Sequence, residues 1–206
     1  MGIPRPILRL TPQDYYTIER AAEFKSEYYE GEMFAMAGGT TRHSLAKIQL
    51  CGELLGKLKA KGGDCRPYDS DQRIKVSATG LRVYPDASVF CGPLEYDEED
   101  DQKETATNPT ALFEVLSDST EAYDRGTKAE HYRKIPSLKA YALLSQNAPH
   151  IELFERQADG SWSLIEASGM TGVLHMRSLG IDLSLGEIYE QIEFPETVLK
   201  MVPLKR

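Results

Sequence analysis

Two acidic residues interrupt segments of this chain that are otherwise apolar, Asp86 in 83–91 (VYPDASVFC) and Glu114 in 111–117 (ALFEVLS). In both segments the residues that alternate onto each face are mostly apolar, which is typical of strands covered on both sides. A carboxylate removed from water without a partner costs several kcal/mol. A single buried acid could form an ion pair with a neighbouring arginine. Two buried acids on successive core strands indicate instead that they share a divalent cation.

A lysine follows the second of these strands on a predicted helix at 124–135, which Pro136 ends. Lys128, Tyr132 and Ile135 stand at i, i+4 and i+7, so they share the helix face that packs on the sheet. Two acids and a lysine that converge can perform metal-assisted phosphodiester hydrolysis. Asp86 and Glu114 would hold Mg²⁺ (or Mn²⁺) through oxygen ligands. Lys128 would orient or deprotonate the attacking water and offset charge on the phosphate.

The elements around these residues predict a mixed α/β fold. Helices are expected from Thr11 and over 43–61, the second ended by Gly62-Gly63. Strands are expected at 28–36, 73–76, 83–91, 111–117 and 139–144, followed by an antiparallel pair at 151–156 and 162–167. We therefore expect a central mixed sheet flanked by helices, with the antiparallel segment extending or covering it.

The composition is that of a globular protein and favours one domain over residues 1–206. The 206 residues are 41% hydrophobic and 27% charged, with a mean hydropathy of −0.42. No segment approaches the roughly 20 apolar residues of a membrane span, and no secretory signal is apparent, so a cytoplasmic protein is expected. Cys51, Cys65 and Cys91 form no C-x-x-C pair, which argues against a disulfide framework and a cysteine zinc site.

The net charge of −8 is concentrated in one segment. Residues 95–104 (EYDEEDDQKE) hold seven acids and one lysine. Crowded like charges repel one another, so the segment is expected to be a solvated, mobile loop. The rest of the chain is near neutral and neither demands nor excludes a nucleic-acid partner.

The order of these motifs resembles the PD-(D/E)XK nuclease superfamily. Tyr84-Pro85-Asp86, followed by FEVLS at 113–117, carries the resemblance. It is closer still to the Uma-two family, a branch grouped with restriction endonucleases, through the segments 28–44, 82–92 and 111–146. The superfamily places its lysine two residues after the second acid, where this chain has Leu116, and similar sequences offer Lys128 instead.

The resemblance implies a restriction-endonuclease-like core over about 10–194 and a Mg²⁺-dependent DNA endonuclease. It also implies a homodimer, because such proteins often pair to cut two strands. Glu32 shares a strand face with Phe34 and Met36, and the resemblance favours it as a third catalytic acid that points inward; the alternative is a salt bridge at the strand edge. His43 could contact phosphate or shuttle a proton, and Gln72 and Arg73 could contact DNA.

Two other interpretations remain open at the sequence level. The chain could be a catalytically inactive relative that binds nucleic acid or protein, which the net charge of −8 slightly favours. Alternatively, Asp86 and Glu114 could form internal ion pairs with Arg73 or Lys128. Geometry separates these hypotheses, because a nuclease needs both carboxylates within reach of one cation and Lys128 beside them.

Overall fold

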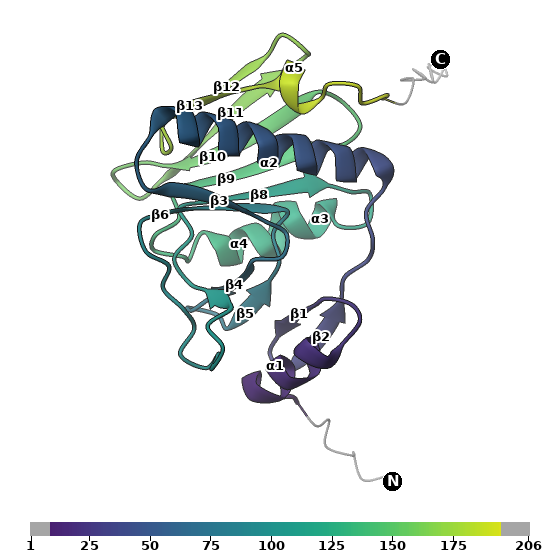
Figure 1. The fold of residues 1–206 in the computed structure, drawn as a ribbon, viewed down its shortest axis with the longest axis vertical. Coiled ribbons are helices and arrows are strands. Elements are labelled where there is room, and N and C mark those ends of the chain that lie inside the picture. The colour runs from purple at the N-terminus through teal and green to yellow at the C-terminus, as the bar shows by residue number, and fades with distance from the viewer. Residues whose placement is uncertain (1–8, 195–206) are drawn as a thin grey trace, which may run out of the picture.

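A six-stranded mixed sheet forms the centre of the molecule. The computed structural model describes residues 9–194. The strand order is β11-β10-β9-β8-β6-β3, in which β8 and β9 are parallel and the other neighbours antiparallel. The bounds are β3 (Cys65–Asp69), β6 (Ala87–Cys91), β8 (Ala111–Leu116), β9 (Ala140–Ser145), β10 (His150–Arg156) and β11 (Trp162–Ser168). The predicted mixed sheet is confirmed, and the hairpin β10–β11 extends it at one edge (Figure 1).

One face of this sheet is covered by the long helix α2 (Thr41–Lys61). Its buried leucines, Leu50, Leu54 and Leu58, lie at helical spacing and join the core formed with β6, β8 and β9. The same core includes β12 (Val173–Met176), β13 (Ile181–Ser184) and α5 (Leu185–Ile188). Within residues 9–194, no helix combines the length and apolar character needed to cross a bilayer.

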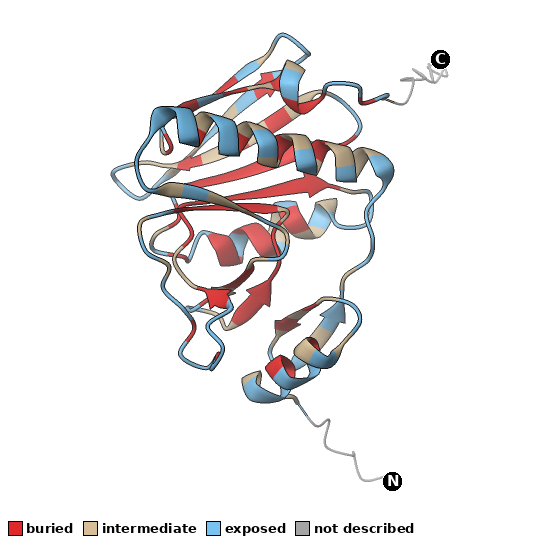
Figure 2. Cartoon of the chain, in the orientation of Figure 1, coloured by how far each residue is buried: buried red, intermediate tan, exposed pale blue. Residues whose placement is uncertain are grey.

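The opposite face is covered by a second layer. It contains α3 (Glu121–Tyr123), a π-helical segment η1 (Asp124–Lys128) and α4 (Ala129–Tyr132), and a smaller sheet of order β2-β1-β5-β4-β7. The strands of that sheet are β1 (Ser26–Tyr29), β2 (Glu32–Ala35), β4 (Arg73–Val76), β5 (Leu81–Val83) and β7 (Thr105–Ala106). Helix α1 (Pro12–Ala21) lies beside β1 and β2 (Figure 1). The central strands are buried between the two layers (Figure 2).

Two predicted strands are each divided in the structure. The segment 28–36 is a hairpin, because Glu30 and Gly31 adopt positive φ angles of 49° and 85° and reverse the chain. The segment 83–91 leaves the small sheet after β5 and enters the large sheet at β6. Pro85 has no N–H group for a strand ladder, and the residues 84–86 join the two sheets. Asp86 therefore lies at the junction and not in mid-strand.

The acidic segment 95–104 is solvated at five of its seven acids, as its charge predicts, but is anchored to the fold by the other two. Asp97 and Asp100 are buried and pair with the guanidinium groups of Arg82 and Arg73, of which Arg82 is only 1% exposed. Tyr16 and Tyr84 accept hydrogen bonds from these arginines at 2.8 Å. We call this set the arginine–tyrosine network: Tyr16, Arg73, Arg82, Tyr84, Asp97 and Asp100. Asp97 and Asp100 differ from the expectation of a mobile loop, because cations from other elements neutralise the repulsion between these acids. Arg73 is committed to this network and is buried, so it is not available to DNA.

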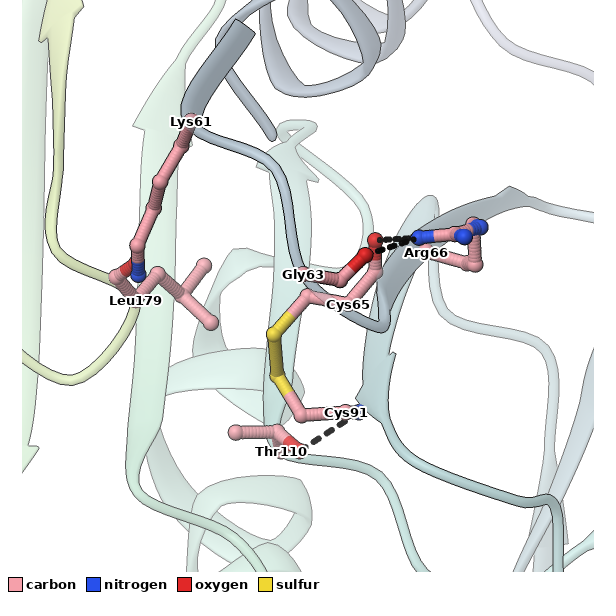
Figure 3. The surroundings of a disulfide bond; sticks show 7 residues. All are labelled: Lys61, Gly63, Cys65, Arg66, Cys91, Thr110 and Leu179. Carbon is pink, nitrogen blue, oxygen red and sulfur yellow. Dashed lines mark hydrogen bonds between the residues drawn. A yellow bond between two sulfur atoms is a disulfide. The ribbon is translucent and has the colours of Figure 1, made fainter. Parts of the chain in front are cut away.

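A disulfide joins Cys65 to Cys91, which corrects the expectation from the cysteine count (Figure 3). The two residues lie directly opposite each other in the antiparallel pair β3–β6. The backbone N–H of Cys91 donates to Thr110 Oγ1 at 3.1 Å. Spacing rules consider cysteines close in sequence, whereas this pair is separated by 26 residues and is brought together only by strand pairing.

Candidate active site

Glu114 lies in the middle of β8, on the sheet face that α3, η1 and α4 cover, and is 4% exposed. Its flanking residues on that face, Leu112 and Leu116, belong to the apolar core. Glu114 Oε1 lies 2.8 Å from Lys128 Nζ and accepts a hydrogen bond of 2.8 Å from the hydroxyl of Tyr132. A buried carboxylate thus meets one cation and one neutral donor, both from the covering helix.

Asp86 lies beside Glu114 at the start of β6. Its backbone N–H donates to Glu114 Oε2 at 3.4 Å, and its own Oδ2 accepts from the backbone N–H of Val115 at 2.8 Å. The antiparallel register, in which Ala87 faces Phe113, explains why residues 86 and 114 become neighbours. The structure therefore brings together Asp86, Glu114 and Lys128, the three residues that the sequence singled out.

Lys128 is surrounded by three carboxylates. Besides Glu114, its Nζ lies 3.3 Å from Glu27 Oε1 and 3.4 Å from Asp124 Oδ1. Burial alone would lower the pKa of Lys128, but the negative charges of Glu114, Glu27 and Asp124 outweigh burial and hold this pKa well above its ordinary value. The cluster therefore favours the ammonium form of Lys128.

The two candidate metal-binding acids have opposite electrostatic character. Burial raises the pKa of Glu114 to about 8, and the negative charges of Asp124 and Asp86 add to the effect while Lys128 opposes it. Burial also opposes ionisation of Asp86, but His43 and the Val115 N–H outweigh it, and the pKa of Asp86 is lowered. Asp86 thus ionises more readily than Glu114, and further positive charge beside Glu114 would favour its ionised form.

The first turns of α2 cover the Asp86 side of the site. His43 Nε2 lies 3.2 Å from Asp86 Oδ2, and Lys47 Nζ lies 3.9 Å from Asp86 Oδ1. Thr40 caps the helix by accepting the backbone N–H of His43 at 3.1 Å. The Asp86 side chain retains 15% of its exposure, compared with 5% for Glu114. An ion or phosphate from solvent would therefore reach Asp86 first.

Glu32 is not part of this cluster. The expectation that it faces inward is wrong, because Glu32 is exposed on β2, the edge strand of the small sheet. Glu27, on the neighbouring strand β1, provides the acid beside Lys128. Sequence reasoning missed it because the predicted strand begins at Tyr28. In β1 the buried residues Ser26 and Tyr28 alternate with Glu27, which lies on the opposite face. A strand predicted to begin at Ser26 would have placed Glu27 on that face.

The local charge fits a divalent cation. Four carboxylates meet only two ammonium groups in this cluster: Asp86, Glu114, Glu27 and Asp124 against Lys128 and Lys47. Oxygen ligands on adjacent strands suit Mg²⁺, which commonly takes one or two carboxylates and keeps several waters. Asp86 and Glu114 fit that pattern, because their residues are neighbours across the β6–β8 pair and Asp86 lies on the side open to solvent.

The arrangement of the chain has known counterparts. The family model for Uma2, described as "Putative restriction endonuclease", matches residues 12–186. The chain belongs to the Uma2 family. Two uncharacterized proteins of Synechocystis sp. are similar to it: slr1290 is 35% identical over 92% of this chain and 96% of its own length, and sll1609 is 32% identical over 78% and 88%.

A solved structure has the same fold as this Uma2 member. A crystal structure from Anabaena variabilis, described as that of "a putative nuclease belonging to DUF820", superposes with a TM-score of 0.65 at 16% identity. The match covers 82% of this chain and 91% of the other chain. The predicted restriction-endonuclease-like family and mixed α/β architecture are therefore confirmed.

Proposed function

We propose that this Uma2 protein is a Mg²⁺-dependent DNA endonuclease that hydrolyses phosphodiester bonds. One observation carries the proposal: the buried pair Asp86 and Glu114, joined by an Asp86 N–H contact of 3.4 Å, with Lys128 Nζ 2.8 Å from Glu114. The descriptions of the family and of the Anabaena protein agree with nuclease chemistry.

Two acidic residues of the site would bind the metal ion, and the basic residues would contact the water and the phosphate. Asp86 and Glu114 would hold Mg²⁺ (or Mn²⁺), which when bound supplies a water of lowered pKa and polarises the phosphate. Lys128, in its ammonium form, would orient the attacking water and offset negative charge on the phosphoryl oxygens. Glu27 and Asp124 would position Lys128, because each accepts one side of its ammonium group. His43 and Lys47 would hold the phosphate that approaches over Asp86.

The number of acids argues against a simple structural ion pair between Glu114 and Lys128. Lys128 Nζ also contacts Glu27 and Asp124, and Asp86 lies beside Glu114. Burial raises the pKa of Glu114 to about 8, so further positive charge beside this carboxylate would favour its ionised form, as a bound metal ion does.

DNA and a second copy of the chain are the partners we propose. Both follow from membership of a family described as restriction endonucleases, since a duplex presents two strands and two copies present two sites. The position of Lys128 beside Glu114 favours an active nuclease over an inactive binding relative, for which a displaced lysine is expected.

Plasmid cleavage with and without metal tests the proposal. Purified protein is incubated with supercoiled plasmid in Mg²⁺ or Mn²⁺, with EDTA as the metal-free control. We expect Asp86→Asn and Glu114→Gln each to reduce cleavage by about 10²–10³-fold or more, while each variant stays folded. Asp182→Asn is the matched control, because Asp182 is an exposed acid on β13 that pairs with His175. Equal cleavage by all variants would refute the site.

Lys128 is tested by separating binding from turnover. Lys128→Ala should reduce the cleavage rate more than it reduces metal affinity, which calorimetric Mn²⁺ titration measures. Equal losses in both would make Lys128 a structural residue. DNA binding by wild-type protein without any metal-dependent cleavage would instead support the inactive binding relative.

A further inference from the structure

Three metal-ligating side chains meet on the outer hairpin β10–β11, apart from the candidate active site. They are His150 and Glu152 of β10 and Glu166 of β11, and each offers a ligand atom within 4.8 Å of the other two. We propose that these residues form a binding site for a first-row transition-metal ion, with Zn²⁺ as the expected occupant. Neither Asp86 nor Glu114 takes part in it.

Strand register creates the site. Glu152 and Glu166 are directly opposite each other in the antiparallel pair β10–β11. Like charges in that position destabilise a sheet unless a cation lies between them. His150, two residues before Glu152, projects from the same face, and its Nε2 lies 3.5 Å from Glu152 Oε1 and 3.4 Å from Glu166 Oε1. Arg125 already offsets part of the Glu152 charge, and a single ion at this point would add one ligand bond from each of the three side chains.

Two neighbours hold the ligand groups in position. His150 Nδ1 is 2.8 Å from Ser168 Oγ, a hydrogen bond that fixes the imidazole ring and leaves Nε2 facing the acids. Arg125 donates to Glu152 Oε2 at 2.6 Å and leaves Oε1 facing His150. Metal-binding histidines and carboxylates in proteins typically have such outer partners, which orient the ring and the carboxylate. Ser168 and Arg125 supply them here for two of the three ligands.

The ligand set distinguishes this site from the candidate active site. One imidazole nitrogen and two carboxylate oxygens suit Zn²⁺, which takes three protein ligands and a water where a position stays open. Mg²⁺ prefers oxygen ligands alone. Glu114 is separated from Glu152 by one strand, because both are paired with Leu143 of β9. Two strand spacings of about 4.8 Å put the two acids roughly 10 Å apart, so one ion cannot serve both.

Metal titration tests the proposal. Asp86→Asn protein, in which the candidate active site is disabled, is titrated with Zn²⁺ by calorimetry and with Co²⁺ by visible absorption. We expect one equivalent to bind, with visible absorption typical of bound Co²⁺. His150→Ala and Glu166→Gln should each weaken binding at least about tenfold, and Ser168→Ala roughly tenfold. His175→Ala is the matched control, because His175 lies 2.7 Å from a single acid, Asp182.

A thermal unfolding measurement gives a second test of the proposed zinc site. Zn²⁺ should also raise the thermal unfolding temperature of the Asp86→Asn protein but not of the same protein carrying Glu166→Gln. Circular dichroism in EDTA checks that each variant is folded. The proposal is overturned if no ion binds at sub-millimolar Zn²⁺, or if His150→Ala and His175→Ala have the same effect. Failure of plasmid cleavage would leave this result unchanged, since the titration does not use DNA.

Discussion

The arginine–tyrosine network and the candidate active site are both buried clusters of charge, yet they differ in how completely their charges are matched. In the network, Arg82 donates to Tyr16, Asp97 and Glu99 and to the carbonyl of Gly80, all within 2.9 Å. At the site, four carboxylates share two ammonium groups and the imidazole of His43.

The pKa values of one acid from each cluster, Asp97 and Glu114, are shifted in opposite directions. Burial opposes ionisation of Asp97, but Lys75, Tyr16 and Arg82 outweigh it and lower its pKa. Burial raises the pKa of Glu114 to about 8, although Lys128 lies beside it. A matched cluster stabilises the fold, whereas a cluster with surplus negative charge is prepared for a positively charged ligand.

The largest expected effect is on stability, from breaking the network. Asp97→Ala leaves the buried guanidinium of Arg82 without its main acid, and such a loss destabilises by about 3–5 kcal/mol. We expect the unfolding temperature to fall by roughly 10 °C, measured by scanning calorimetry. Asp86→Ala should lower it by less, because that change removes only the acceptor of the Val115 N–H and the contacts to His43 and Lys47 at the edge of the cluster. A larger fall for Asp86→Ala than for Asp97→Ala would reverse the comparison.

The contributions of Glu114 and Asp97 to the stability of the fold should change with pH in opposite directions. The neutral form of Glu114 stabilises the fold fully below its unfolded pKa of about 4.3, and this contribution is lost as pH rises through about 8. Asp97 behaves in the opposite way, because its lowered pKa stabilises the fold above about pH 3.9 and the contribution is lost in acid.

We therefore expect Glu114→Gln, measured in EDTA, to raise the unfolding temperature by about 5 °C near pH 9 and little near pH 5. Asp97→Asn should lower it near pH 7, with a smaller deficit near pH 3. Calorimetric unfolding across pH measures both. Parallel pH profiles for the two variants would show that the clusters are electrostatically alike.

The smallest expected effect compares two glutamates of one hairpin. Glu27→Gln weakens the positioning of Lys128 and should reduce cleavage by about tenfold, a modest loss for a residue outside the reacting atoms. Glu32→Gln, on the exposed edge strand, should leave cleavage unchanged. Initial rates on supercoiled plasmid measure both. A greater loss for Glu32→Gln would show that the edge strand, and not Glu27, completes the site.

The sequence predicted the site where local context was unusual. Asp86 and Glu114 were detectable because apolar neighbours made each carboxylate conspicuous, and Lys128 because its helix follows the Glu114 strand. Glu27 and Lys47 were not, since an acid in a short polar strand and a lysine on an amphipathic helix are ordinary features. Only the packing of β1 and α2 around the central sheet gives them a role.

The sequence likewise predicted part of the fold and missed another part. Periodicity predicted the central strands and α2, but not β3, whose sequence (CRPYD) has no apolar alternation. Without that strand, its register with β6 and the disulfide could not be anticipated. The two buried acids of the acidic segment were misjudged for a related reason, because their partners Arg73 and Arg82 lie on strands that precede them and meet them only in the folded chain.

The junction at residues 84–86 has one more consequence. Tyr84 belongs to the arginine–tyrosine network, and Asp86, two residues later, belongs to the candidate active site. Residues 84–86 therefore connect the two sheets directly, so the position of β5 in the small sheet helps to fix where Asp86 lies beside Glu114. Substitutions in the arginine–tyrosine network are therefore expected to reach the candidate active site through this connection, without changing any of its acids.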